Sequence, residues 1–239
     1  MLEARVVDPQ DVGGGLLDRL VRDVDDRPLR LLAEGLLRVR QPIAPASVAD
    51  GLVAVSDFLT PEQCDAIRAE LSFAHWYPSA VVGGGLGPRI SSSRVSETTD
   101  ESWFTPQLSR SLRRLDRRIA AFFPAFLERR EEWQATRYFR GGGFRAHFDC
   151  GHWHDEPAGE REHSMVVFLD TPRAGGETCF PLLGVAIRPK AGLLLAWRNL
   201  AAGGGRDPLM IHSSLPVRAG RKTILVTWLR QRVYERRVR

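Results

Sequence analysis

The sequence predicts an α+β chain in which β structure dominates and helices precede most of the strands. Two observations lead to this fold class. Between about residues 135 and 230, short runs rich in β-branched and aromatic residues alternate with Gly, Pro and Asp turn signals. Upstream of them, apolar residues recur at helical spacing. Seven or eight short strands spaced in this way favour an antiparallel sandwich or jelly roll.

The first fifty residues are expected to form an extension outside this fold. Leu16–Val39 alternates apolar clusters with Asp and Arg, which predicts amphipathic helix. The run QPIAPAS is interpreted as a linker because it holds two prolines. Residues 1–50 are therefore assigned to an N-terminal helical extension and linker. The main domain is assigned to residues 51–239, a length that suits one hydrophobic core.

Two helices are expected near the start of the main domain. The first begins with TPEQ, in which Thr60 caps the helix, Pro61 fits the first turn and Gln63 completes a capping box. The second begins at Thr105, followed by Pro106, and carries Arg on its outer face. Their apolar stripes are Cys64, Ile67 and Leu71 in the first helix, and Leu108, Leu112, Leu115, Ile119 and Phe122 in the second.

The segment between these helices, from Pro78 to about Ser102, is rich in Gly and Ser. It is too long for a simple connection, so it is a candidate lid or substrate loop. After the second helix, strands are expected at ATRYFR, FRAHFD, HSMVVFLD, ETCFPL, VAIRP, LLLAW, PLMIHSS and KTILVTWL.

Composition excludes several classes of protein. No apolar run is long enough to span a bilayer, and the N-terminus lacks the apolar region of a secretory signal. Three widely spaced cysteines without a C-x-x-C pair favour a reducing cytosol. No Gly triplet leads into G-K-[ST], so no phosphate loop is expected. The net charge is +5 and the C-terminal tail is Arg-rich, but no aromatic-rich nucleic-acid signature accompanies it.

The run RAHFDCGHWHD holds two pairs of possible metal ligands. Side chains at positions i and i+2 of a strand point the same way, so His147 and Asp149 form one pair, and His152 and His154 the other. Together with His212, the first pair would make two imidazoles and one carboxylate, the facial triad of non-heme Fe(II) oxygenases. The second pair, with Glu156 or Glu160, is similar to a cupin-type ligand set. It lies among turn signals, a poorer platform that favours a solvated loop or pocket rim.

Lys222 is the charged residue of an otherwise apolar predicted strand. A buried charge is costly without a partner, and a cation beside an Fe(II) site would suit the distal carboxylate of 2-oxoglutarate. Taken alone, the pattern favours an exposed lysine on an edge strand.

From about Gly51 to Leu229 the chain resembles the prolyl-4-hydroxylase-like branch of the Fe(II)/2-oxoglutarate-dependent oxygenases. Six segments match in order, namely VSDFLTPEQCDAIRAEL, the R-x-S at Arg94, YFRGGGFRAHFD, GGETCFP, the PKAG run before Trp197, and HSSLPVRAGRKTILVTW. The resemblance implies a double-stranded β-helix (jelly roll) core at about 135–230 with flanking N-terminal helices.

The resemblance also assigns roles. It implies His147, Asp149 and His212 as iron ligands and catalytic residues, with Fe(II), 2-oxoglutarate and O2 as cofactor and cosubstrates, and ascorbate as a possible stimulant. The implied 2-oxoglutarate contacts are Lys222 and Tyr138, with Thr178 and Trp228 lining the same pocket. The substrate would be bound at the rim by Arg94, His152, Trp153 and His154.

Departures from the family pattern are mild. Gly142 and Phe144 stand where the family often has Gln and Tyr. Asp149 keeps the carboxylate that halogenases of the superfamily lack. Lys222 replaces the arginine-based ending of the AlkB-type nucleic-acid demethylases, which argues against nucleic acid as a partner.

The expected function is hydroxylation of an unactivated C–H bond in a small molecule, an amino acid or a natural-product intermediate, with release of succinate and CO2. The compact chain without peptide-binding repeats is the reason. The alternative is a protein or peptide (prolyl) hydroxylase, and less favoured readings are a non-catalytic cupin-like metal-binding protein and a nucleic-acid binder. A deep pocket closed by residues 78–102 would favour a small substrate, and an open groove a peptide. We expect a cytoplasmic monomer or homodimer without nucleic-acid or membrane partners.

Overall fold

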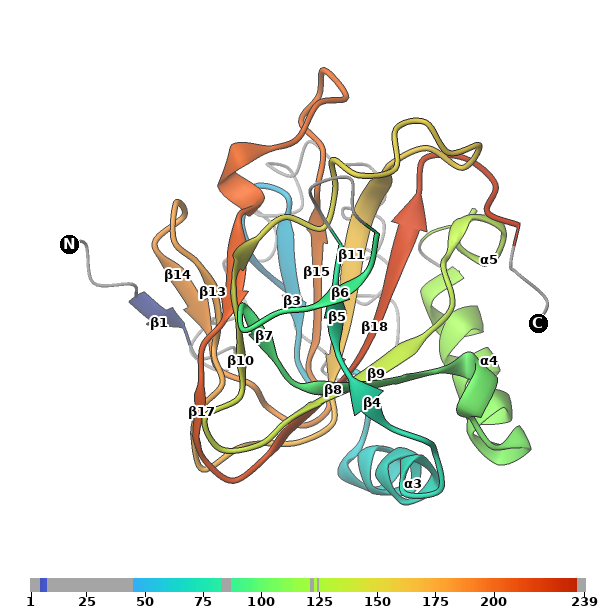
Figure 1. Cartoon of the computed structure of the whole chain (residues 1–239), viewed down its shortest axis with the longest axis vertical. Helices are drawn as coiled ribbons and strands as arrows, with labels where there is room; N and C mark the ends of the chain where they lie inside the picture. Colours follow the sequence, from blue (N-terminus) through green and yellow to red (C-terminus); the bar gives the residue numbers. More distant parts are fainter. Residues whose placement is uncertain (1–4, 8–44, 83–86, 121–122, 124, 236–239) are drawn as a thin grey trace.

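The computed structural model describes residues 5–7, 45–82, 87–120, 123 and 125–235. In this part of the chain the strands form an eight-stranded and a six-stranded sheet. The α-helices lie on the face of the eight-stranded sheet that is turned away from the smaller sheet (Figure 1). Nearly all strand pairs are antiparallel, and β1 with β14 is a parallel pair. The mainly β, jelly-roll fold expected from the sequence is confirmed.

The larger sheet has the order β2-β3-β15-β11-β18-β9-β8-β4. Its strands are β2 (Pro45–Ala49), β3 (Leu52–Val55), β15 (Leu194–Arg198), β11 (Arg161–Phe168), β18 (Lys222–Arg230), β9 (Gln134–Tyr138), β8 (Glu97–Asp100) and β4 (Tyr77–Pro78).

The smaller sheet has the order β1-β14-β13-β16-β10-β7. Its strands are β1 (Arg5–Val7), β14 (Val185–Ile187), β13 (Thr178–Phe180), β16 (His212–Ser214), β10 (Gly143–His147) and β7 (Arg94–Val95). Two further pairs are β12 (Ala174–Gly175) with β17 (Val217–Ala219), and β5 (Ala80–Val81) with β6 (Arg89–Ile90).

Alternation along the central strands divides the interior into two cores. On β11, Met165 and Val167 pack with the helices, whereas Val166 and Phe168 belong to the cluster between the two sheets. This is the consequence of a side-chain period of two on a strand. The inner face of β18 carries Lys222 and a row of apolar residues toward the smaller sheet. The larger sheet therefore has one face that packs against the helices, called the structural face below, and one face that lines a cavity.

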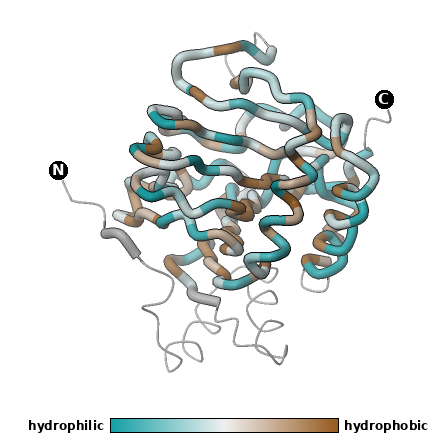
Figure 2. The backbone as a smooth tube through the Cα atoms, turned by 90° about the horizontal axis from the view of Figure 1, so that it is seen from below, coloured by the Kyte–Doolittle hydropathy of each residue, from teal (hydrophilic) through white to brown (hydrophobic). Residues whose placement is uncertain are grey.

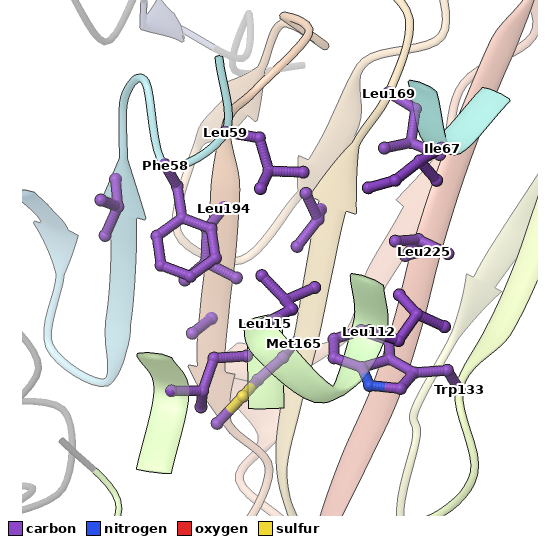
Figure 3. Packing of buried hydrophobic residues seen from close by; sticks show 14 of the residues in the cluster. Phe58, Leu59, Ile67, Leu112, Leu115, Trp133, Met165, Leu169, Leu194 and Leu225 are labelled. Carbon is purple, nitrogen blue, oxygen red and sulfur yellow. The ribbon is translucent and has the colours of Figure 1, made fainter. Parts of the chain in front are cut away.

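The helices α3 (Pro61–Leu71), α4 (Pro106–Ala120) and α5 (Phe126–Arg129) cover the structural face. Figure 3 shows Leu112 and Leu115 of α4 packed over Met165, Leu194 and Leu225 of the sheet. The burial of each side chain of this size stabilises the fold by about 1.5–3 kcal/mol. These helices hold the larger sheet from outside and leave its inner face for the site.

Local sequence explains where the helices begin. The predicted capping box at α3 is present, because Thr60 Oγ1 accepts from the Gln63 amide at 3.3 Å and Gln63 Oε1 accepts from the Thr60 amide at 3.0 Å. Thr105 Oγ1 likewise accepts from the Leu108 amide, at 3.0 Å. The predicted apolar stripes of both helices are buried, while Phe122 lies outside the described residues.

Three parts of the chain differ from the expectation. Residues 78–102 were expected to form one loop, but in the described portion they form β5, β6, β7 and β8 after the start in β4. Residues 45–47, assigned to a linker, belong to β2, which pairs with β3. Pro208–Met210 is a single 3₁₀ turn rather than strand. The helix expected at Leu16–Val39 lies outside the described residues, and the domain division at residue 50 stays a prediction.

Hydrophobic and hydrophilic residues alternate along the tube in short stretches (Figure 2). Accordingly, none of the helices in the described ranges has the length and apolar character needed to cross a bilayer.

Candidate active site

Three possible metal ligands meet at the ends of two neighbouring strands of the smaller sheet. His147 ends β10 and His212 begins β16, and these residues are register partners in an antiparallel pair. Asp149 follows two residues after β10. One ligand atom from each residue lies within 4.8 Å of the others. The strand alternation that joined His147 with Asp149 in the sequence, and the choice of His212 as third member, both match this geometry.

Backbone carbonyls hold both imidazole rings in the same orientation. His147 Nδ1 lies 2.8 Å from the carbonyl oxygen of Arg145, and His212 Nδ1 lies 2.9 Å from that of Met210. A carbonyl only accepts, so each Nδ1 carries the proton and each Nε2 has a free lone pair. Both Nε2 atoms lie 3.6 Å from the carboxylate of Asp149.

Asp149 is itself held by a chain of hydrogen bonds. Ser164 Oγ donates to Asp149 Oδ2 at 2.6 Å, and Asn199 Nδ2 donates to Ser164 Oγ at 2.9 Å. Burial opposes ionisation, yet the two histidines, the guanidinium of Arg161 and the Ser164 hydroxyl lower the pKa of Asp149 to about 2. The carboxylate is therefore charged at neutral pH.

The electrostatic state of His147 suits a ligand as well. Burial and the neighbouring His212 lower the pKa of His147 to about 3, so its ring is neutral at pH 7. Two imidazole nitrogens and one carboxylate that converge from one side are the donor set of non-heme Fe(II) sites, which leave the opposite positions free. The residues present thus fit Fe(II).

The competing ligand set is not assembled. Within the described ranges, the triad of His147, Asp149 and His212 is the single group of three His, Cys, Asp or Glu residues close enough to share an ion. The side chain of His154 is 72% exposed and lies 2.8 Å from Asp155. The turn after β10 thus directs His154 to solvent, as the solvated-loop alternative expected.

Lys222 is buried rather than exposed on an edge. It lies on β18 between β11 and β9, and 1% of its surface is accessible. Its Nζ donates to the Gly176 carbonyl at 2.8 Å, to Ser214 Oγ at 2.9 Å and to Thr178 Oγ1 at 3.4 Å. All three acceptors are neutral, and burial lowers the pKa of Lys222 to about 7. A buried cation with neutral acceptors alone is a place where an anion would be stabilised.

One cavity of about 660 Å³ connects the triad with Lys222. Tyr138, Thr178 and Trp228 line it, as do Arg94, His152 and Trp153, whereas His154 does not. The size lies within the roughly 300–1,000 Å³ of ordinary ligand pockets. The cavity therefore unites all the predicted site residues except His154.

Individual contacts determine the positions of the predicted site residues. Tyr138 is the register partner of Lys222 across β9 and β18. Trp228 Nε1 is buried and has no hydrogen-bond partner among the described residues. Arg94 donates to four neutral oxygens, those of Ala80, Ser96, Thr98 and Thr136. These four bonds fix the Arg94 side chain at the edge of the cavity.

Sequence reasoning missed two groups of residues. Arg161 lies between two indole rings, 4.0 Å from the centre of Trp153 and 3.5 Å from that of Trp228, and makes a two-pronged bond to Glu131. No sequence signal joins Glu131 to Arg161. Ser164 could have been noticed, because it is a polar residue within an apolar strand.

The comparisons with known proteins agree with this site. The 2OG-Fe(II) oxygenase superfamily matches residues 133–230. Prolyl 4-hydroxylase 1 of Arabidopsis thaliana is 26% identical over 236 residues, which cover 90% of this chain and 81% of that protein. Prolyl 4-hydroxylase subunit alpha-1 of Gallus gallus is 32% identical over 149 residues, or 59% of this chain, and the match spans 28% of that longer protein.

A solved structure is similar over most of the fold. The viral collagen prolyl hydroxylase of Paramecium bursaria Chlorella virus-1, in complex with 2-oxoglutarate, aligns with a TM-score of 0.60 and 26% identity. The alignment covers 76% of this chain and 97% of that one. The jelly roll and its His-Asp-His site define an Fe(II)/2-oxoglutarate-dependent dioxygenase. Residues 133–230 thus match the 2OG-Fe(II) oxygenase superfamily, and the chain is prolyl-4-hydroxylase-like in sequence and fold.

Proposed function

We propose that this chain hydroxylates a prolyl residue of a peptide or protein, using His147, Asp149 and His212 to hold Fe(II) and Lys222 to hold 2-oxoglutarate. The observation that carries the proposal is the cavity that joins the convergent triad to a buried lysine whose hydrogen-bond acceptors are all neutral. The match to the superfamily implies Fe(II), 2-oxoglutarate and O2. Bound together, they supply the oxidation of a C–H bond, with release of succinate and CO2.

The chain's own residues prepare the metal site. The carbonyls of Arg145 and Met210 fix the two rings, so that each Nε2 is available without rotation. The bond from Ser164 fixes the carboxylate of Asp149. Ligands held in this way need little reorganisation when the ion binds, which favours high metal affinity and a defined coordination geometry.

Lys222 gives the cosubstrate its orientation. Its ammonium lies deep in the cavity, beside the hydroxyls of Thr178 and Ser214. A carboxylate in this place would accept a charge-assisted hydrogen bond in a desolvated setting, where such bonds are strong. The apolar side chains of Val166, Ile224 and Val226 line the same cavity and limit the access of water.

The preference for a peptide over a free small molecule reverses our first expectation. The Arabidopsis relative that aligns over 90% of this chain is named as a prolyl 4-hydroxylase, and the viral one as a collagen prolyl hydroxylase. In the described part of the 78–102 segment, short strands rather than one long loop contribute lining residues to the cavity. Trp153 and Trp228 line the same cavity, with the Arg161 guanidinium stacked between their rings.

The test uses the full chain supplied with Fe(II), 2-oxoglutarate and O2. Proline-containing peptides are compared with the same peptides carrying Ala for Pro, and with free proline. We expect succinate formation and the gain of one oxygen atom, located on the prolyl ring by mass spectrometry, with the Pro peptides alone. Turnover of free amino acids without turnover of peptides would contradict the proposal and indicate a small-molecule hydroxylase. His147→Ala serves as the inactive control.

A further inference from the structure

We propose that Arg206 forms a carboxylate-binding subsite where the cavity opens to solvent, and that it selects substrates with a carboxylate close to the reacting residue. The inference deepens the proposed function and rests on it for the identity of the substrate. It concerns a residue to which neither the triad nor the 2-oxoglutarate site gives a role.

Of the basic groups that line the cavity, Arg206 is the one to which no role has been assigned. Among the basic groups, Arg161 is paired with Glu131, Lys222 faces the 2-oxoglutarate end, and Arg94 uses four of its five donors on neutral oxygens. Arg206 donates one hydrogen bond within the described residues, from its terminal nitrogen to the Cys150 carbonyl at 3.3 Å. Most of its five donors thus remain for a ligand.

The acidic lining groups do not neutralise Arg206. Asp149 belongs to the metal triad, and Asp100 accepts from the Tyr77 hydroxyl at 2.6 Å and from the Ser102 amide. Asp207, the next residue in the chain, instead caps the 3₁₀ turn by accepting from the Leu209 amide at 3.0 Å. Across the described ranges no carboxylate forms an ion pair with Arg206.

The fold holds the guanidinium in place. It lies over the ring of Phe148, 4.5 Å from the ring centre. It also covers the backbone of Gly151, where an added Cβ would come within 1.9 Å of the guanidinium nitrogen. Gly151 has φ +92°, a conformation that favours glycine, and the end of the Arg206 side chain occupies the space that a larger residue would fill. Arg206 is exposed and lines the cavity, which places it at the opening.

A planar guanidinium fixed against a ring and a glycine matches the two oxygens of a carboxylate. That carboxylate could belong to an Asp or Glu side chain of a peptide, or be the α-carboxylate of a free amino acid or chain end. The chemistry is the same, and the two sources are distinguished by the ligand offered.

The experiment measures binding and turnover separately. Labelled prolyl peptides with Glu, Gln or Lys, scanned through the positions on either side of the proline, are titrated into the Fe(II)- and 2-oxoglutarate-loaded chain without O2. A second series carries a free or an amidated C-terminus. Turnover is then measured with O2. The variants are Arg206→Gln and Arg206→Glu, and the control is Arg113→Glu, a charge reversal at an exposed arginine of α4.

We expect at least one Glu position, or the free C-terminus, to bind about three- to fivefold more tightly than its neutral counterpart, as for an exposed ion pair at low salt. Arg206→Gln should remove this preference and Arg206→Glu should transfer it to the Lys peptide, while Arg113→Glu keeps it. Side-chain and terminal carboxylates are told apart by which series responds.

Equal binding of acidic and neutral peptides, or a preference that survives in Arg206→Glu, overturns the subsite. If neutral peptides are hydroxylated without such a preference, the prolyl hydroxylase assignment stands and the subsite fails. If an Arg206-dependent preference is measured but no prolyl peptide is hydroxylated, the subsite stands and the prolyl assignment fails.

Discussion

His147 and His212 face each other across the β10–β16 pair, and each ring is fixed by the carbonyl two residues before it. The ring centres lie 4.3 Å apart. This symmetry aims both Nε2 atoms at the carboxylate of Asp149. The site is thus pre-organised by backbone geometry, and its sensitivity should lie in the groups that hold Asp149.

Replacing Ser164 with Ala should weaken Fe(II) binding by about ten- to a hundredfold, the usual cost of removing a partner of a metal ligand. The reason is that Asp149 loses the donor of its 2.6 Å bond and Asn199 loses its acceptor. Titration with Fe(II) or Mn(II) measures the change. Ser111→Ala on α4 is the control and should leave metal affinity unchanged. Unaltered affinity in Ser164→Ala would show that Asp149 needs no such support.

Replacing Lys222 with Met should weaken 2-oxoglutarate binding by about ten- to a hundredfold, since a hydrogen bond to a charged group contributes about 1.5–3 kcal/mol. Metal affinity should be retained, because Lys222 contacts none of the three ligands in the triad. Calorimetry of the Mn(II)-loaded chain gives both values. Normal 2-oxoglutarate affinity in this variant would remove Lys222 from the site.

The affinity for 2-oxoglutarate should fall as the pH rises above about 7. Burial lowers the pKa of Lys222 from 10.5 to about 7 in the free protein, and a bound carboxylate favours the charged form. Below pH 7 the lysine is already protonated. Above it, binding must take up a proton, so the dissociation constant increases with pH.

Calorimetry at pH 8 in two buffers of different ionisation enthalpy detects this uptake. Lys222→Arg is the matched variant, because a guanidinium keeps its proton at this pH and should bind without uptake. Identical enthalpies in both buffers for the wild-type chain would contradict the lowered pKa.

Replacing Glu131 with Gln should destabilise the fold by about 3–5 kcal/mol, because it leaves Arg161 without its anionic partner and removes one of the two carboxylates that pair with buried Arg230. Glu131 Oε1 accepts from both Arg161 and Arg230, at 2.7 and 3.0 Å. Urea denaturation measures the free energy of unfolding. The control is Glu97→Gln, whose carboxylate pairs with Arg137 at the surface and should contribute below about 1 kcal/mol. Equal effects would mean that the buried network adds no stability.

The sequence was sufficient for the parts of the site that regular strands determine. The i, i+2 spacing of His147 and Asp149 is a local pattern that survives folding. The apolar run around Lys222, taken alone, favoured an exposed lysine, and its burial depends on the position of β18 between β11 and β9. The 78–102 segment has none, because its strands are two to four residues long and too short to show alternation. The pairing of Glu131 with Arg161 depends on contacts distant in sequence. His154 was placed at the rim because it is close to Asp149 in sequence, but the intervening turn separates them.

The most direct test of the account is an anaerobic titration of the Fe(II)-loaded chain with 2-oxoglutarate, followed by the weak visible absorption of the chelate. We predict that the band appears in the wild-type chain, is absent in Asp149→Ala, requires more 2-oxoglutarate in Lys222→Met, and is unchanged in His152→Ala. Metal binding that survives in Asp149→Ala but is lost in His152→Ala, with no band in the wild-type chain, would contradict the assignment of the triad and of the oxygenase chemistry.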